Sequence, residues 1–341
     1  MKNILLVTTG GTIGSTIDNQ TINVNNRSSL KLLQLFQQHS EEAGNINFKT
    51  VSAYNLLSEN LKPEYWQKLI QLIEAENLQH FDGIIVTHGT DTLAFTASML
   101  GLYFNYLDIP LLLVSSQYPL DHPEANGLKH FICAVDYITQ QQPAGVFVPY
   151  QNPGQVLELH IATRLASSLQ LSSDFISVQS KAWMQYHQGR FIQQQDIDFS
   201  HRINTRLKTD FSTRVLLIKP YPGLDYNFFN LESADVILHD LYHSGTACAT
   251  DTASTDSLLW LLQQCHKKNI PVYLTPAVYQ KNIYDSSRKI IQQGGKIIWN
   301  TSLETAYCKL LLAYGNFNDP QSIERFLKQE IALEHISPVP V

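Results

Sequence analysis

The sequence predicts an α/β fold with a large N-terminal domain and a smaller C-terminal α/β domain. Short, wholly apolar runs alternate with amphipathic stretches, which is the order of a mostly parallel sheet with helices on both faces. The 341 residues are better suited to two domains than to one. A polar, glutamine-rich stretch interrupts the alternation, so we expect a large domain over 1–184, a linker over 185–213 and a small domain over 214–341.

In the N-terminal half, apolar runs predict five strands, and the periodic stretches between them predict four helices. Pro63 suits a first helical turn, because its missing N–H would be unpaired there in any case. The strands are expected at 3–7, 46–52, 83–87, 111–115 and 145–149, and the helices near 28–39, 63–78, 92–105 and 124–141.

The C-terminal half repeats the alternation on a smaller scale. Its four apolar runs predict a second sheet, again with helices between the strands. The strands are expected at 214–218, 235–239, 270–274 and 296–299, and the helices near 254–267, 283–293, 303–313 and 320–333.

Charge and composition exclude several classes of partner. The net charge is −6 and the basic residues are scattered, so we expect no nucleic-acid partner and no anionic membrane surface as a partner. No apolar run is long enough to span a bilayer. Met1 leads directly into a strand without a signal-peptide pattern, which predicts a cytoplasmic protein. The cysteines are far apart and form no C-x-x-C pair, so we expect neither a metal site nor disulfides.

Two loops carry the strongest chemical signal. Residues 8–15 follow the apolar run 4–7, and residues 87–92 follow the run 83–86. Each loop therefore leaves the carboxyl end of a buried parallel strand, where open α/β sheets bind their ligands. Threonine hydroxyls beside glycines suit acyl chemistry with a hydroxyl nucleophile, although Thr12 taken alone is equally typical of a helix cap.

The two loops resemble the signature segments of the bacterial-type L-asparaginase/glutaminase family, in its cytoplasmic type I-like form, and the resemblance extends over nearly the whole chain. The matching segments are Thr9-Gly10-Gly11-Thr12-Ile13, Tyr54-Asn55-Leu56-Leu57-Ser58-Glu59-Asn60, His88-Gly89-Thr90-Asp91-Thr92, Leu112-Leu113-Val114-Ser115-Ser116-Gln117 and Lys219-Pro220-Tyr221-Pro222-Gly223. Two specific motifs in the right order, with matching flanks, are a much stronger signal than a single Gly-Gly-Thr.

The resemblance implies an amidohydrolase that converts L-asparagine to L-aspartate and ammonia, with L-glutamine as a further substrate to be considered. Thr12 matches the acylated nucleophile, Thr90 the second catalytic threonine, and Asp91 the carboxylate that holds the substrate ammonium. Ser58 matches the serine that binds the substrate carboxylate. The substrate-binding set implied is Gly11, Ser58, Glu59, Gly89, Thr90 and Asp91.

The resemblance also implies properties of the assembly. Such proteins use no metal and no organic cofactor. They form homodimers or homotetramers, and each site lies at the seam between one subunit's large domain and a partner's small domain. A small-molecule amide is then the expected partner.

Three departures bear on the chemistry. The family's R-A-T-K segment aligns so that Glu158 stands at the arginine and Ile161 at the catalytic lysine, which removes a group able to take the threonine proton. His160 is the first candidate for a substitute base, with Lys129 and His243 as others. There is also no tyrosine between residues 12 and 53, where many members carry one. Finally, the S-D-G-x-x-N segment appears as 124–130, with an asparagine and a histidine in place of its Asp and Asn.

Three functions therefore remain open from the sequence. The first is an active asparagine amidohydrolase, favoured because both threonine motifs are present. The second is a protein that binds asparagine or aspartate with little or no turnover. The third is a glutaminase component of an amidotransferase that resembles the archaeal Glu-tRNA enzyme. The missing N-terminal extension and the lack of a basic surface signature argue against the third.

Overall fold

The computed structural model describes residues 1–336 except 12, 14, 19–20, 25–27 and 200–204. The chain forms two compact units that divide between Arg206 and Leu207, and each is described by itself. In the part of the chain that the structure describes, no helix has the length and apolarity needed to cross a bilayer.

The first unit is built on an eight-stranded sheet with the order β10-β9-β8-β7-β6-β5-β1-β4. The strands from β4 to β7 pair in parallel, and β8, β9 and β10 then continue the sheet antiparallel. The strands are β1 (Lys2–Gly10), β4 (Ile46–Leu56), β5 (Gly83–Thr87), β6 (Leu111–Val114), β7 (Val146–Tyr150), β8 (Leu157–Ile161), β9 (Met184–His187) and β10 (Arg190–Gln193), beside a hairpin of β2 (Ser15–Asp18) and β3 (Thr21–Val24). All five predicted strands are present.

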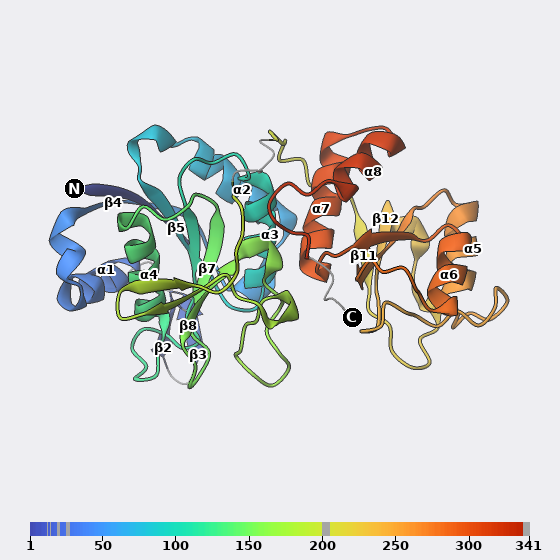
Figure 1. Ribbon diagram of the computed structural model, residues 1–341, viewed down its shortest axis with the longest axis horizontal. Coiled ribbons are helices and arrows are strands. Elements are labelled where there is room, and N and C mark those ends of the chain that lie inside the picture. Colours follow the sequence, from blue (N-terminus) through green and yellow to red (C-terminus); the bar gives the residue numbers. More distant parts are fainter. Residues whose placement is uncertain (12, 14, 19–20, 25–27, 200–204, 337–341) are drawn as a thin grey trace. The chain divides into compact units, whose positions relative to one another are not determined.

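Helices cover both faces of this sheet, which explains why its central strands are apolar on both sides. Ile4 to Val7 of β1 and Ile84 to Val86 of β5 have no exposed surface. On one face, α1 (Ser28–His39) lies against α4 (Gly127–Thr139); on the other, α2 (Pro63–Glu74) lies against α3 (Leu93–Tyr103) (Figure 1). The core of the first unit therefore has two layers, one on each side of the sheet.

The expected linker over 185–213 is wrong in its first part, because β9 and β10 form a hairpin that belongs to the large sheet. Tyr186 and Phe191 of this hairpin pack against each other, and the Phe191 ring meets Tyr137 of α4 edge-on at 5.4 Å. The glutamine-rich composition is compatible with a strand here because β10 is the outermost strand of the sheet and is largely exposed. The first unit thus extends to Arg206 rather than to residue 184.

The last residues of the first unit are fastened to the end of α3. The Asn105 amide donates to the Thr205 carbonyl at 3.0 Å and accepts from the Thr205 N–H at 2.9 Å. The Arg206 guanidinium lies 3.5 Å above the Tyr106 ring, and the Tyr106 hydroxyl donates to Glu74 at 2.9 Å. The chain therefore leaves the first unit from a fixed point beside α3.

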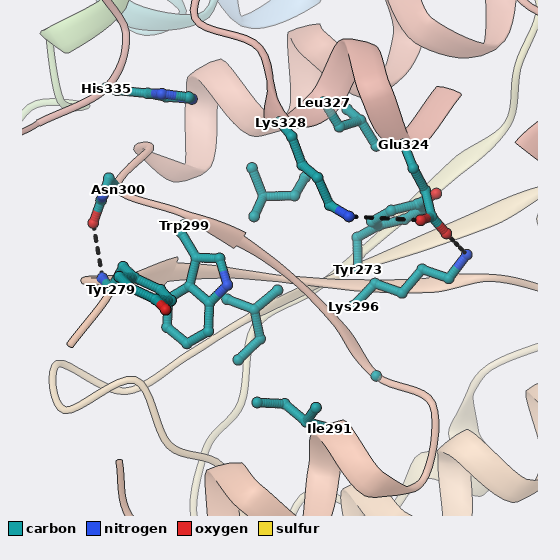
Figure 2. Close-up of a pocket in the computed structure, with 13 residues that line it drawn as sticks. Tyr273, Tyr279, Ile291, Lys296, Trp299, Asn300, Glu324, Leu327, Lys328 and His335 are labelled. Carbon is teal, nitrogen blue, oxygen red and sulfur yellow. Dashed lines mark hydrogen bonds and ion pairs between the residues drawn. The ribbon is translucent and has the colours of Figure 1, made fainter. Parts of the chain in front are cut away.

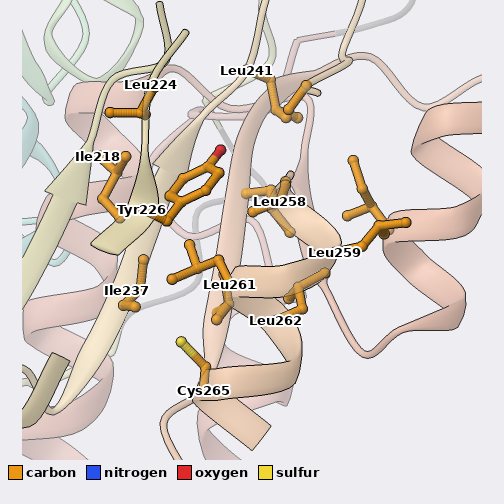
Figure 3. Packing of buried hydrophobic residues seen from close by; sticks show 14 of the residues in the cluster. Ile218, Leu224, Tyr226, Ile237, Leu241, Leu258, Leu259, Leu261, Leu262 and Cys265 are labelled. Atoms are coloured by element: carbon orange, nitrogen blue, oxygen red, sulfur yellow. The ribbon is translucent and has the colours of Figure 1, made fainter. Parts of the chain in front are cut away.

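The second unit has a four-stranded, wholly parallel sheet with the order β11-β12-β13-β14. Helices α5 and α6 lie together, as do α7 and α8, and α7 and α8 contact the sheet through β11, β13 and β14. The elements are β11 (Val215–Ile218), β12 (Val236–Asp240), α5 (Leu258–Lys267), β13 (Val272–Ala277), α6 (Asp285–Gln292), β14 (Lys296–Trp299), α7 (Leu303–Asn316) and α8 (Pro320–Lys328). The core beneath α5 packs Ile237, Leu258, Leu261 and Leu262 around Tyr226 (Figure 3).

A buried ion pair ties α7 to the segment after α8. The Lys309 ammonium lies 2.5 Å from the Glu334 carboxylate, and neither side chain has exposed surface. The carboxylate also accepts the backbone N–H groups of Ile331 and Ala332, and the ammonium donates to the Gln329 carbonyl. Burial would raise the pKa of Glu334, but Lys309 and these hydrogen bonds outweigh it and hold that pKa below its usual value.

Candidate functional site

The candidate site lies at the carboxyl edge of the large sheet. Strands β4, β1 and β5 are neighbours and run in parallel, so the loops that follow them leave the sheet side by side. The Thr9 hydroxyl donates to the Thr87 carbonyl at 2.7 Å and joins the ends of β1 and β5. This arrangement brings together the two loops that carry the threonine motifs.

Glycines allow these loops to touch through their backbones. The Gly11 N–H donates to the Leu56 carbonyl at 2.9 Å. A Cβ atom on Gly11 would lie 2.3 Å from the Gly89 nitrogen, and one on Gly89 would lie 2.4 Å from the Ser58 hydroxyl oxygen. Gly11 also has a φ of +74°, which side-chain-bearing residues rarely adopt. The glycines of the two motifs are therefore required by close packing, and they set the positions of Ser58 and the loop after β5.

Ser58 and Asp91 form the polar centre of the site. The Ser58 hydroxyl donates to an Asp91 carboxylate oxygen at 3.2 Å. Ser58 is buried in the short 3-10 helix Ser58–Asn60, whereas Asp91 is exposed. The Thr92 hydroxyl donates to the Ser58 carbonyl at 3.0 Å and fixes this helix against the loop that bears Asp91. A hydroxyl and a carboxylate so placed can bind the two charged groups of an α-amino acid.

His88 has a structural role beside this centre. Its backbone N–H donates to the Val114 carbonyl at 2.9 Å, and its ring Nδ1 lies 2.8 Å from the Gly89 carbonyl. Burial lowers the pKa of His88 to about 4, although the hydrogen bond to Gly89 and the Asp91 charge act in the opposite direction. The imidazole is therefore neutral near pH 7, and it supports the loop as a hydrogen-bonding group.

The loop after β6 supports the first motif from a second side. The Asn126 side chain accepts the Gln117 N–H at 2.8 Å and donates to the Gln151 carbonyl at 3.1 Å. A Cβ atom on Gly127 would lie 2.7 Å from the Ser116 Cβ and 3.1 Å from the Cδ1 of Ile13. Asn126, which is one of the departures from the family pattern, thus links the ends of β6 and β7.

Most of the predicted substrate-binding residues come together. Gly11, Gly89 and Ser58 touch, Asp91 is hydrogen-bonded to Ser58, and Thr90 lies between Gly89 and Asp91 at the start of α3, where its carbonyl accepts the Leu93 N–H. Glu59 is exposed next to Ser58. The predicted nucleophile Thr12 is outside the described residues.

The residues at the predicted lysine position lie in the interior of the sheet. His160 pairs with Val148 across the β7–β8 ladder, and Ile161 pairs with Phe147, near the amino end of β7. The His160 ring is buried, with Nδ1 2.9 Å from the Ser177 hydroxyl. Burial, with a smaller contribution from His130, lowers the pKa of His160 to about 4. Its role as a substitute base stays a prediction.

Sequence reasoning missed two residues that hold the site together, Thr92 and Asn126. Thr92 belongs to a recognisable motif, but its hydrogen bond to Ser58 joins segments 34 positions apart. Asn126 stands out in the sequence only as a departure from the family pattern. A polar residue that follows a glycine-packed loop is a signal for such a role. Among the described residues, no group of three His, Cys, Asp or Glu side chains is placed to hold a metal ion.

Comparisons with known proteins agree with this geometry. A family model described as "Asparaginase, N-terminal" matches residues 3–192. The chain is 26% identical over 340 residues to a glutamyl-tRNA(Gln) amidotransferase subunit of Methanosphaera stadtmanae, and the match covers 97% of this chain and 76% of that protein. It is 27% identical over 348 residues to the corresponding amidotransferase subunit of Methanobrevibacter smithii, with coverages of 98% and 77%.

Solved structures share the whole fold. The thermostable L-asparaginase from Thermococcus kodakarensis superposes with a TM-score of 0.79 at 22% identity, over 98% of this chain and all of that one. L-asparaginase I from Vibrio cholerae gives a TM-score of 0.79 at 20% identity, over 98% and 99% of the two chains. A probable cytoplasmic L-asparaginase from Campylobacter jejuni gives 0.76 at 20% identity, over 97% and 100%.

Proposed function

The chain belongs to the asparaginase family, and from that premise we propose that it hydrolyses the side-chain amide of L-asparagine to L-aspartate and ammonia. The observation that carries the proposal is the Ser58–Asp91 pair at the carboxyl edge of the large sheet. An α-amino acid carries an ammonium and a carboxylate on one carbon atom. A carboxylate and a hydroxyl 3.2 Å apart are matched to those two groups.

The two residues have complementary tasks in this proposal. Asp91 is exposed and accepts hydrogen bonds from the substrate ammonium. The Ser58 hydroxyl, which donates to Asp91 in the free protein, rotates to donate to the substrate carboxylate. Thr92 keeps Ser58 in place while the hydroxyl changes partner.

The chemical step would use Thr12 as the nucleophile. Its hydroxyl oxygen forms a bond to the side-chain amide carbon, and the C–N bond breaks as ammonia leaves with the hydroxyl proton. Water then cleaves the resulting ester to give aspartate and to restore Thr12. Backbone N–H groups of the glycine loops are suited to stabilise the oxyanion in both steps, because fixed donors need no reorganisation. Thr90 is the second hydroxyl group in this scheme.

Ammonia release from purified protein tests the proposal. We expect release from L-asparagine that is lost in Thr12→Ala and that requires Asp91, so that Asp91→Ala raises KM sharply. D-Asparagine serves as a stereochemical control, because the clamp recognises the α-carbon groups. Ammonia release no faster than with Thr12→Ala, at high protein concentration, would rule the proposal out.

A glutaminase component of an amidotransferase is the second candidate, and the names of the two amidotransferase relatives favour it. Such a component would release ammonia from L-glutamine in preference to L-asparagine. The two amides differ by one methylene, which is worth about 1–3 kcal/mol in a pocket, so the ratio of kcat/KM values decides between them. Binding of either amino acid in calorimetry without any ammonia release would instead identify a binding protein.

The group that accepts the threonine proton has two basic candidates around Ile161. His160 precedes it, and Arg164 follows it in the 3-10 helix Ala162–Arg164, which packs against α3. A base at His160 predicts that His160→Gln abolishes turnover but leaves binding intact. A cation that stabilises a deprotonated threonine predicts instead that Arg164→Gln has that effect and that Arg164→Lys restores it.

We further propose a cytoplasmic homodimer or homotetramer with a small-molecule substrate and no nucleic-acid partner. Sedimentation at several protein concentrations tests the assembly. Mixing Thr12→Ala with a variant altered in the second unit tests whether two subunits complete one site, since restored ammonia release requires a shared site. A gel shift with tRNA tests the last point.

A further inference from the structure

The second unit contains a groove that the proposed amide chemistry does not use. It has a volume of about 440 Å³ and follows β14, the outermost strand of the small sheet. All four residues of β14, Lys296 to Trp299, line it. Ile291 of α6 lies on one side, and Glu324, Leu327 and Lys328 of α8 lie on the other (Figure 2). The groove therefore exposes the outer edge of a sheet between two helices.

The backbone of β14 has donors and acceptors directed into this groove. The Ile298 carbonyl faces β13, where it accepts the Thr275 hydroxyl at 3.2 Å. Because successive residues of a strand point their backbone groups to opposite sides, the N–H and C=O groups of Ile297 and Trp299 face outward. The Trp299 carbonyl accepts the Thr301 hydroxyl at 3.0 Å and keeps a second lone pair for another donor. The groove thus offers the edge pattern that an added strand would satisfy.

One end of the groove is positively charged. Glu324 lies 2.7 Å from Lys296 and 3.8 Å from Lys328, so one carboxylate faces two ammonium groups. The Lys328 side chain is 79% exposed and that of Lys296 is 39% exposed. The chain as a whole carries a net charge of −6, which makes this cationic end distinct from the rest of the molecule. Its charge favours a carboxylate.

The other end is aromatic. Tyr279 meets Trp299 edge-to-face, with ring centroids 5.5 Å apart, and 62% of Tyr279 is exposed. Leu327 and Ile291 continue this apolar surface across the groove. Apolar side chains that alternate along a strand would pack here, because every second residue of an added strand faces the same side.

We propose that this groove binds an extended peptide, which adds to β14 as a fifth strand of the small sheet. The peptide carries an acidic residue near Lys296 and Lys328 and an aliphatic or aromatic residue near Trp299. The four residues of β14 span about 13 Å, so a segment of about four to six residues fills the groove. A second copy of the chain fits less well, since its own α6 and α8 would enter the space that α6 and α8 already flank.

A labelled synthetic peptide tests the proposal. The probe is a fluorescein-labelled hexapeptide of alternating valine and glutamate, and anisotropy measures its binding to the whole chain. We expect saturable binding that weakens about tenfold in Lys328→Glu and remains unchanged in Lys267→Glu, an exposed lysine of α5 outside the groove. The same peptide with alternate amides N-methylated should not bind, because its strand-pairing donors are gone.

Each other outcome overturns the proposal. No binding at millimolar peptide rejects it. Equal binding of the N-methylated peptide shows a side-chain site without strand addition. Self-association of the protein that Lys328→Glu abolishes identifies a second copy as the occupant. Ammonia release, measured on the same variants, is expected to stay unchanged, so failure here and failure of the proposed amide hydrolysis are distinguishable.

Discussion

The two units treat the edges of their sheets in opposite ways. In the first unit, the loops at the carboxyl edge close on one another through Gly11 and Gly89 until their backbones touch. In the second unit, β14 leaves its side edge open between α6 and α8. Backbone contact leaves a signature in the sequence because only glycine permits it. An open edge has no such signature, since it arises from the placement of whole helices.

The units also differ in how they bury polar groups. Within the described residues, the first unit buries three histidines with a pKa lowered to about 4, His88, His130 and His160, and the second buries one, His239. The second unit adds the buried pair of Lys309 and Glu334. One unit therefore depends on neutral rings and the other on a compensated pair of charges.

Mild acid should separate the two units most strongly. A histidine with a pKa of about 4 when folded and 6.5 when unfolded contributes stability above pH 6.5, and that stability is lost as the pH falls toward 4. Each fully buried ring is worth about 3 kcal/mol over this range. We expect hydrogen exchange in the first unit to accelerate more between pH 7 and pH 5 than in the second. Equal acceleration in both units would contradict this assignment.

Removal of one member of the buried pair should destabilise the second unit. Lys309→Met leaves the Glu334 carboxylate buried without its cation, which typically costs about 3–5 kcal/mol. The double variant Lys309→Met/Glu334→Leu should recover much of that loss, because both charges are then gone. Urea unfolding monitored by hydrogen exchange in α7 measures both. A double variant as unstable as the single one would show that packing, and not charge, dominates.

A single methyl group at Gly89 should disrupt the first unit's site. The new Cβ would lie 2.4 Å from the Ser58 hydroxyl, so Gly89→Ala displaces Ser58 from Asp91. A shift of about 1 Å in a positioning group costs about 100-fold in rate, and we expect a loss of that size in ammonia release. Gly44→Ala is the matched control, because no atom lies within 4 Å of its Cβ position. Normal turnover in Gly89→Ala would mean that the loops are not held as described.

Loss of the Thr92 hydroxyl should have the smallest effect. Thr92→Val keeps the shape of the side chain but removes the hydrogen bond to the Ser58 carbonyl. We expect KM for the amino acid to rise by a few fold, in line with about 1 kcal/mol for one hydrogen bond, with little change in stability. Thr92→Ser should behave like the unaltered protein. A KM unchanged in Thr92→Val would place the fixing of Ser58 elsewhere.

Much of the fold follows from the sequence because its elements have strong periodic signals. The predicted bounds 28–39, 83–87 and 296–299 are those of α1, β5 and β14. Strands β8, β9 and β10 are not predicted, since none of them shows apolar alternation that is distinct from a loop. Their place in the sheet is fixed by pairing with a neighbour that lies earlier in the chain.

The site is predictable only as far as its motifs reach. Gly11, Ser58, Gly89 and Asp91 belong to recognisable segments, and they do come together. The interior position of His160 depends on the β7–β8 register, which sequence alone does not specify. The groove along β14 depends on α8 lying beside an edge strand, so no local pattern indicates it.

The fastening of Thr205 to Asn105 has a mechanical consequence. Helix α3 begins directly after Asp91 and Thr92, and the end of the first unit is gripped just beyond its last residue. Its 11 residues make a rod of about 16 Å with the amino-acid clamp at one end and the chain's exit at the other. A pull on the connecting chain is therefore delivered along the axis of α3, and a substrate that tightens Asp91 pushes back through the same rod.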